Sequence, residues 1–282
     1  MLLITTIAGV RARRRELWQQ GRTVAFVPTM GALHEGHLRL VDRARELADE
    51  VWASVFVNPT QFGPGEDFER YPRDLERDRA LLAGRGVALL FAPGVKEMYP
   101  RPPATVIDLP ELASGLCGAF RPGHFRGVAL VVTKLLAITQ PEWAVFGAKD
   151  WQQAAIIRRL VEDLDVPVRV EVAPTVREPD GLAMSSRNAY LGPDERRAAT
   201  VLARALRAGE AAIAAGERDG EAVRQAVAAV VAAEPLAQLQ YAAVVDPDSL
   251  QPLSRIDRRA LLALAVHIGT TRLIDNLLVE VS

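Results

Sequence analysis

Short runs of consecutive apolar residues recur along the first two thirds of the chain. Between these runs, apolar residues recur at helical spacing, most clearly over residues 40–48 and 154–164. Near-continuous apolar runs are typical of strands buried on both faces of a parallel sheet. The alternation of strand and helix predicts a doubly wound α/β domain. The predicted strands cover residues 23–28, 51–57, 87–92, 143–146 and 166–172.

The pattern changes after Gly192. Residues 194–234 are rich in alanine and are interrupted at Gly216 and Gly220, which predicts two helices. Three further apolar runs, at residues 238–246, 260–268 and 272–281, predict strands. We therefore expect a Rossmann-like domain over residues 1–175 and a smaller C-terminal α+β domain over residues 176–282, joined near residues 176–192.

Composition removes several classes of function. The 282 residues carry a formal net charge of −1, which favours neither nucleic acid nor a membrane surface as a partner. We find no signal peptide and no apolar segment near the roughly 20 residues of a membrane span, so we expect a cytoplasmic protein. The single cysteine, Cys117, excludes an intrachain disulfide and a cysteine-rich zinc site, and we interpret it as structural.

Two histidines follow the first of these strands, in the segment PTMGALHEGH. We expect a helix to begin near Gly36, with His37 in its first turn and His34 just before it. The N–H groups at a helix N-terminus attract phosphate, and imidazoles there can donate to phosphate oxygens. A zinc site is a weaker interpretation, because the spacing is not His-Glu-x-x-His and no third ligand is evident. Two solvated loop histidines remain the third interpretation.

Polar residues also follow two other strands. Asn58 and Gln61 are neutral amides suited to a hydroxylated substrate, although the segment also fits a simple turn. Lys149 is a cation suited to phosphate. Asp150 and Gln153 resemble a helix-capping pair, which gives both residues a structural explanation.

The segment after the fifth strand contains Ser185, Ser186 and Arg187. Paired hydroxyls beside an arginine suit a polyphosphate, and a capping or turn role suits the serines nearly as well. Three strand-end loops thus supply phosphate-type donors. Neither a Walker loop nor a G-x-G-x-x-G motif occurs in the sequence.

The segment HEGH resembles the His-x-Gly-His signature of the class I nucleotidyltransferase superfamily. Longer blocks resemble the pantothenate synthetase (pantoate–β-alanine ligase) family, in family order over residues 22–278. These blocks are PTMGALHEGH, VFVNPTQFGPGEDFERYPR, RPGHFRGVALVVTKL, GAKDWQQ, the segment PTVREPDGLAMSSRN, and RLIDN.

This resemblance implies an AMP-forming carbon–nitrogen ligase that acts in pantothenate biosynthesis. (R)-Pantoate would attack the α-phosphate of ATP to give pantoyl adenylate and pyrophosphate, and β-alanine would then displace AMP to give pantothenate. The resemblance also implies Mg²⁺ with ATP, no tightly bound organic cofactor, a homodimer, and a second domain that closes over the active site.

Site residues follow from the resemblance position by position. His37 would be the proton donor, with His34 and Lys149 as its catalytic partners. Gln61 and Gln153 would hold pantoate, with Gln61 also near β-alanine and Asn58 beside them. No metal ligand is assigned, although Asp150 is the nearest acidic residue. The implied ATP-binding residues are Met30, Gly31, Ala32, Leu33, His34, Glu35, Gly36, His37, Gly147, Ala148, Lys149, Asp150, Val176, Met184, Ser185, Ser186 and Arg187.

Two residues depart from the family pattern. Ala148 stands where an acidic residue or glutamine is usual, and Arg39 where a small polar residue is usual. Three other functions remain open: a nucleotidyltransferase that acts on a phosphorylated substrate, a nucleotide-binding regulator without turnover, and a zinc-binding structural module.

Overall fold

The computed structural model describes residues 1–281 and divides into two compact units. Unit 1 comprises Met1–Leu109, Arg121–Ala148 and Ile156–Pro174. Unit 2 comprises Pro110–Phe120, Lys149–Ala155 and the chain from Thr175 onward. Two short segments of the expected first domain therefore belong to unit 2. The last residue of the expected second domain, Ser282, lies outside the described residues.

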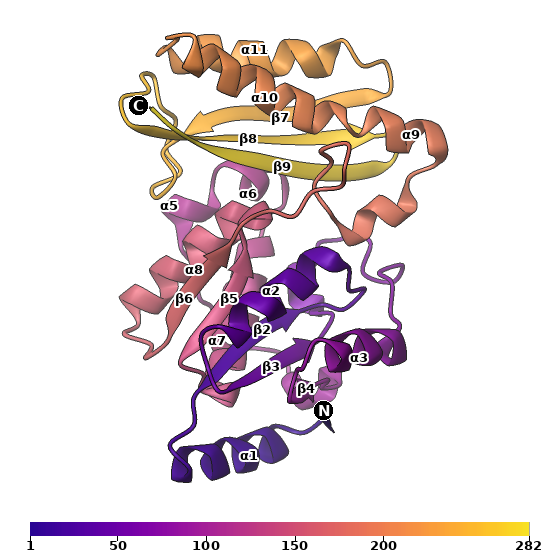
Figure 1. Ribbon diagram of the computed structural model, residues 1–282, viewed down its shortest axis with the longest axis vertical. Coiled ribbons are helices and arrows are strands. Elements are labelled where there is room, and N and C mark those ends of the chain that lie inside the picture. The colour runs from indigo at the N-terminus through magenta and orange to yellow at the C-terminus, as the bar shows by residue number, and fades with distance from the viewer. Residues whose placement is uncertain (282) are drawn as a thin grey trace. The chain divides into compact units, whose positions relative to one another are not determined.

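Unit 1 is built on a six-stranded parallel sheet with the strand order β1-β4-β3-β2-β5-β6 (Figure 1). This order confirms the predicted Rossmann-like doubly wound fold. All five predicted strands are present, with boundaries that differ by a few residues, and an additional short strand forms one edge of the sheet. The strands are β1 (Leu2–Ile4), β2 (Val24–Thr29), β3 (Glu50–Val55), β4 (Leu89–Phe91), β5 (Trp143–Gly147) and β6 (Arg169–Ala173).

The strand order reverses at β2. From β2 the chain adds β3 and β4 on one side, and it returns to add β5 and β6 on the other. In open α/β sheets, ligands bind beyond the carboxyl ends of the strands at such a switch point. The segments that leave β2 and β5 are therefore the first places to look for a site.

Helices cover both faces of this sheet. Ala25 and Val27 of β2 share one buried cluster with Leu40, Val41 and Ala44 of α2, so α2 lies over that face. The intervening residue of β2 points to the opposite face, because side chains alternate along a strand. The helices of this unit are α1 (Ile7–Gln19), α2 (Glu35–Arg45), α3 (Leu75–Gly84), α4 (Val95–Met98) and α7 (His124–Thr139), with the 3-10 turn η1 (Pro59–Gln61).

Unit 2 is built on a three-stranded antiparallel sheet with the order β7-β8-β9, comprising β7 (Ala237–Val245), β8 (Arg259–Ile268) and β9 (Thr271–Glu280). Figure 1 shows α10 (Val201–Ala214) and α11 (Gly220–Ala232) along one face of this sheet. These are the two helices predicted from the alanine-rich segment. They bury a cluster that includes Leu206, Val227, Leu262 and Leu264.

The remaining elements of unit 2 are short or belong to both units. They are α5 (Pro110–Ala113), α6 (Leu116–Phe120), η2 (Ala148–Asp150), η3 (Ser186–Tyr190) and α9 (Pro193–Ala198). Helix α8 (Trp151–Asp163) begins in unit 2 and ends in unit 1. Over residues 1–281, no helix has the length and apolar character that crossing a membrane requires.

Candidate functional site

The two histidines lie at the N-terminus of α2, where they cap the helix. His34 is the N-cap residue, and its Nδ1 accepts a hydrogen bond from the Gly36 N–H at 3.1 Å. The Nδ1 of His37 accepts from the His34 N–H at 3.4 Å, so the two side chains form a reciprocal capping box. Their ring centroids are 4.1 Å apart. Capping thus holds both imidazoles at the positive end of the helix.

These contacts determine which ring nitrogen carries the proton. A backbone N–H only donates, so both Nδ1 atoms are acceptors without a proton, and each neutral ring carries its proton on Nε2. In the neutral form, each ring therefore donates through its Nε2–H group.

The turn after β3 places two neutral amides together. The Asn58 Nδ2 donates to the Gln61 Oε1 at 3.1 Å, and the Gln61 Nε2 donates to the Met30 Sδ at 3.2 Å. Asn58 also caps η1, where its side chain accepts a hydrogen bond from the Thr60 N–H. The buried Gln61 side chain, by contrast, contacts the loop that follows β2. The structure thus brings Asn58, Gln61 and Met30 into one cluster.

Helix α7 supports this cluster from behind. A Cβ atom on Gly127 would lie 2.2 Å from the Thr60 carbonyl oxygen and 2.7 Å from the Gln61 Cα, so only glycine allows the helix to pack this closely. The Gly127 carbonyl also accepts from the Asn58 Nδ2 at 3.1 Å. Another amide contact comes from the Tyr99 hydroxyl, which donates to the Asn58 Oδ1 at 2.9 Å.

Side chains at the start of α7 and in the segments around it complete the support. One ring nitrogen of His124, Nδ1, is 2.8 Å from the Gln61 carbonyl oxygen. The Arg121 Nε donates to the Glu66 Oε1 at 2.8 Å. Burial alone would raise the pKa of Glu66, but the Arg121 guanidinium outweighs burial and holds that pKa below its usual value. Sequence reasoning missed this framework; its only signal was the segment RPGH, which suggested no role.

In unit 2, Lys149 lies two residues after the end of β5. Its Nζ is 3.8 Å from the Asp150 Oδ1, and its carbonyl accepts from the Asn276 Nδ2 at 2.7 Å. The capping pair considered for Asp150 and Gln153 is not formed among residues 1–281. The turn η2 runs straight into α8, so Asp150 already has a helical backbone. Gln153 is therefore not used as a cap.

The segment after β6 folds into a tight hairpin that brings two predicted ATP-binding residues together. The Met184 N–H donates to the Val176 carbonyl at 3.0 Å, and Gly181 forms the turn with a φ of 93°. Ser185 follows as the N-cap of η3, where its hydroxyl accepts from the Arg187 N–H at 3.3 Å. The capping role considered for one of the serines is thus confirmed for Ser185.

Strand β9 braces both of these segments of unit 2. The Arg177 guanidinium, in the hairpin, donates to both carboxylate oxygens of the buried Asp275, at 2.6 and 3.0 Å. Asn276, the next residue of β9, holds the Lys149 carbonyl. Two neighbouring residues of one strand therefore position the hairpin and the start of the 149–155 segment.

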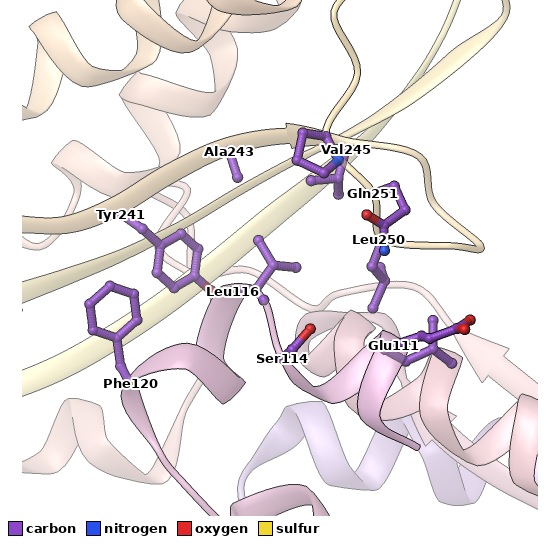
Figure 2. Close-up of a pocket in the computed structure, with 12 residues that line it drawn as sticks. Glu111, Ser114, Leu116, Phe120, Tyr241, Ala243, Val245, Leu250 and Gln251 are labelled. Carbon is purple, nitrogen blue, oxygen red and sulfur yellow. The ribbon is translucent and has the colours of Figure 1, made fainter.

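A separate pocket of about 210 Å³ in unit 2 contains none of the predicted site residues (Figure 2). Leu116, Tyr241 and Leu250 are among its mostly apolar lining residues. Cys117 lies beside it, with its Sγ 3.3 Å from the Tyr241 hydroxyl and 3.4 Å from the Arg272 Nη2. Burial raises the pKa of Tyr241 far above its usual value, so this hydroxyl stays protonated.

Across residues 1–281, no group of three or more histidine, cysteine, aspartate or glutamate side chains has the arrangement of a metal site. The fold and the site together define a doubly wound α/β protein with a phosphate-type helix N-terminus at its topological switch point. The more specific assignment comes from comparison with known proteins.

The chain belongs to the pantoate–β-alanine ligase family, whose model matches residues 2–278. The pantothenate synthetase of Roseiflexus sp. (strain RS-1) is 60% identical over 280 residues, which span 99% of this chain and 100% of that protein. The crystal structure of pantothenate synthetase from Thermus thermophilus matches with a TM-score of 0.93 at 50% identity, over 98% of this chain and 99% of that one.

A third relative was crystallised with ligands. Pantoate–β-alanine ligase from Francisella tularensis, complexed with β-γ ATP and β-alanine, matches with a TM-score of 0.80 at 36% identity. The match covers 99% of this chain and 97% of that chain. Because these matches are full-length, the family resemblance seen in the sequence motifs is confirmed.

Proposed function

We propose that this enzyme catalyses the ATP-dependent condensation of (R)-pantoate with β-alanine to give pantothenate. The observation that carries the proposal is the cluster in unit 1, in which Gln61 contacts Met30 of the same loop that leads to the capping histidines. A phosphate-type helix N-terminus and an amide suited to a hydroxy acid are thereby joined in one site. Full-length membership of the ligase family supports the same reaction.

The reaction takes two steps. In the first, a pantoate carboxylate oxygen bonds to the α-phosphorus of ATP, and the bond from that phosphorus to the bridging oxygen breaks to release pyrophosphate. In the second, the β-alanine amine bonds to the acyl carbon of pantoyl adenylate, loses a proton, and displaces AMP. Neither step requires a covalent enzyme intermediate, so the protein contributes mainly positioning and charge stabilisation.

In unit 1, the Nε2–H groups of His34 and His37 would donate to the phosphates, assisted by the positive end of α2. His37 would be the proton donor as charge builds on the departing pyrophosphate. Gln61 would hold pantoate and lie near β-alanine, with Asn58 fixing its amide through the 3.1 Å hydrogen bond. The backbone of residues 30–37 would form one wall of the ATP site.

We propose further roles for unit 2 and for Gly147 and Ala148 of unit 1. Lys149, the residues from Gly147 to Asp150, Val176, and the residues from Met184 to Arg187 would bind the same ATP, and Gln153 would bind pantoate. In this proposal, the second domain closes over the adenylate and protects it from water. The support within unit 2 is the bracing of Lys149 and of the hairpin by β9.

Mg²⁺ is proposed to arrive with ATP, where it would neutralise charge on the phosphates. Magnesium typically keeps several waters and binds through phosphates and one or two carboxylates, and the carboxylate of Asp150, beside Lys149, would fit that mode. A homodimer and a cytoplasmic location complete the proposal. Light scattering on the purified protein tests the dimer directly, since a monomer mass would contradict it.

The reaction is tested by following pyrophosphate and AMP release with purified protein, ATP and Mg²⁺. We expect pyrophosphate exchange into ATP to require pantoate, and AMP formation to require both acids. His37→Ala is expected to lower exchange by about 10²–10³-fold, the usual effect of losing one transition-state contact. His267→Ala, on β8, is the matched control and should keep full activity. Absence of AMP from folded wild-type protein with all three substrates would refute the function.

A further inference from the structure

Helix α3 contributes a carboxylate that is absent from the set of site residues described so far. Asp78 has only 1% of its surface exposed. Its Oδ2 accepts from the Ala32 N–H at 2.9 Å, and its Oδ1 accepts from the Leu33 N–H at 2.8 Å. Both oxygens of one buried carboxylate are therefore bound to consecutive backbone groups of the loop between β2 and α2.

This loop has a conformation that needs such support. Gly31 has a φ of 86°, and Ala32 has a φ of 52°, a left-handed conformation that residues with a Cβ atom rarely adopt. Such conformations persist where the surroundings hold them. The hydrogen bonds to Asp78 are made by Ala32 itself and by the residue after it.

The loop also borders a cavity. A cavity of about 270 Å³ is lined by Met30, Gly31 and Asp78, among other residues. A Cβ atom on Gly31 would lie 2.8 Å from the Asp78 Oδ2 and 3.0 Å from the Val55 Cγ1, so the carboxylate and an apolar side chain both approach the loop closely. The hydrogen bonds accepted by Asp78 therefore act together with the apolar packing of Leu33 to fix the loop.

The effect reaches the histidines through the chain. The Arg77 Nη1 donates to the Leu33 carbonyl at 3.1 Å, so α3 holds both backbone groups of the residue that precedes His34. His34 in turn caps α2 and accepts in the capping box with His37. We propose that Asp78 is a positioning residue, which fixes the loop before α2 and thereby the orientation of both capping histidines for adenylate formation. This inference rests on the proposed function for its kinetic consequence, and its structural consequence stands alone.

The protonation state of Asp78 agrees with this role. Burial raises the pKa of Asp78, and the N–H groups of Leu33 and Ala32 oppose that effect by stabilising the carboxylate. Arg77, at 4.0 Å, also favours the ionised form, whereas Asp74 disfavours it. Burial of this carboxylate costs free energy, and the two hydrogen bonds to its oxygens offset part of that cost.

The test compares Asp78→Asn with Asp74→Asn. Asparagine has nearly the same shape as aspartate, but its amide nitrogen would face one of the two N–H groups. Asp74 caps the same helix by accepting from the Arg77 N–H, without touching the loop, so it controls for loss of α3 stability. Hydrogen exchange of the peptide containing residues 30–34 should accelerate at least tenfold in Asp78→Asn and remain unchanged in Asp74→Asn.

Kinetics provide the second measurement. Asp78→Asn should lower the kcat of pantoate-dependent pyrophosphate exchange by about 10²-fold with little change in the KM for pantoate, as expected for a displaced catalytic group. The inference would be overturned if Asp78→Asn and Asp74→Asn had the same kcat and the same hydrogen-exchange rate over residues 30–34. If Asp78→Asn does not fold, hydrogen exchange of the wild-type protein provides the test. The inference would then be overturned if the Ala32 and Leu33 amides exchanged much faster than the amides of α2. A wild type without pyrophosphate exchange would refute the proposed function, and hydrogen exchange would still test the inference.

Discussion

Replacement of Gly127 by alanine tests how far the packing of α7 on η1 controls the site. The new Cβ atom would lie 2.2 Å from the Thr60 carbonyl oxygen, 2.5 Å from its carbon and 2.7 Å from the Gln61 Cα. All three are backbone atoms, so no side-chain rotation relieves the clash. Ordinary contact begins at 3.4 Å, so the gap to the oxygen must widen by more than 1 Å.

Two effects follow from this displacement. Overpacking of this kind typically costs about 1–3 kcal/mol, and we expect the upper end because backbone must move. The same movement carries Gln61 away from Met30, and a displacement of about 1 Å at a substrate-positioning residue costs about 10²-fold in rate. We therefore expect Gly127→Ala to fold with lower stability and to lose about 10²-fold in kcat/KM for pantoate.

Urea unfolding and pantoate-dependent pyrophosphate exchange measure the two effects separately. Gly84→Ala is the matched control: Gly84 is the last residue of α3, and its added Cβ would meet nothing within 4 Å. That variant should keep full activity, with stability unchanged or raised by up to about 1 kcal/mol. Wild-type stability together with wild-type pantoate dependence in Gly127→Ala would show that the contact with η1 does not position Gln61.

Three further predictions concern unit 2. Gln153→Ala should raise the KM for pantoate more than that for ATP; steady-state kinetics with each substrate varied test this, and two unchanged KM values would remove Gln153 from the proposed pantoate site. Asp275→Asn should cost about 3 kcal/mol in urea unfolding, because it breaks the buried pair with Arg177, and a loss below 1 kcal/mol would contradict this. Burial and Arg272 lower the pKa of His267 below 6.5, so the unfolded chain takes up the proton first, and stability falls as pH drops below about 6.5. His267→Gln should flatten that loss in unfolding titrations, and an equally steep loss would refute the assignment.

Local pattern predicted the sheet of unit 1 well because its central strands are buried on both faces and are almost wholly apolar. The prediction failed where the pattern was weak. Strand β1 has three partly exposed residues. Helix α7 is apolar nearly all round, so its sequence shows little helical periodicity. Strand β6 begins at Arg169 rather than at residue 166, after Pro167, which lacks a backbone donor.

In the candidate site, local features were also predictable from the sequence, whereas long-range contacts were not. The positions of His34 and His37 at the start of α2 were close to what the sequence predicted, although their capping of the helix was not predicted. The supports were not predictable, because they join residues that are distant in sequence. Asp78 binds the N–H of a residue 45 positions earlier, and Gly127 faces a turn 67 positions away. Such contacts depend on the folded backbone, and no local pattern records them.

The position of Cys117 gives unit 2 a built-in chemical reporter. The sequence contains no other cysteine, and this thiol is buried between Tyr241 and Arg272. A thiol-modifying reagent reacts with it only in molecules where α6 has separated from β7, so the labelling rate measures the free energy of that opening. Because every label falls on one atom, the mass of the intact protein counts opened molecules directly. Unit 2 can thus be followed in solution without introducing a probe.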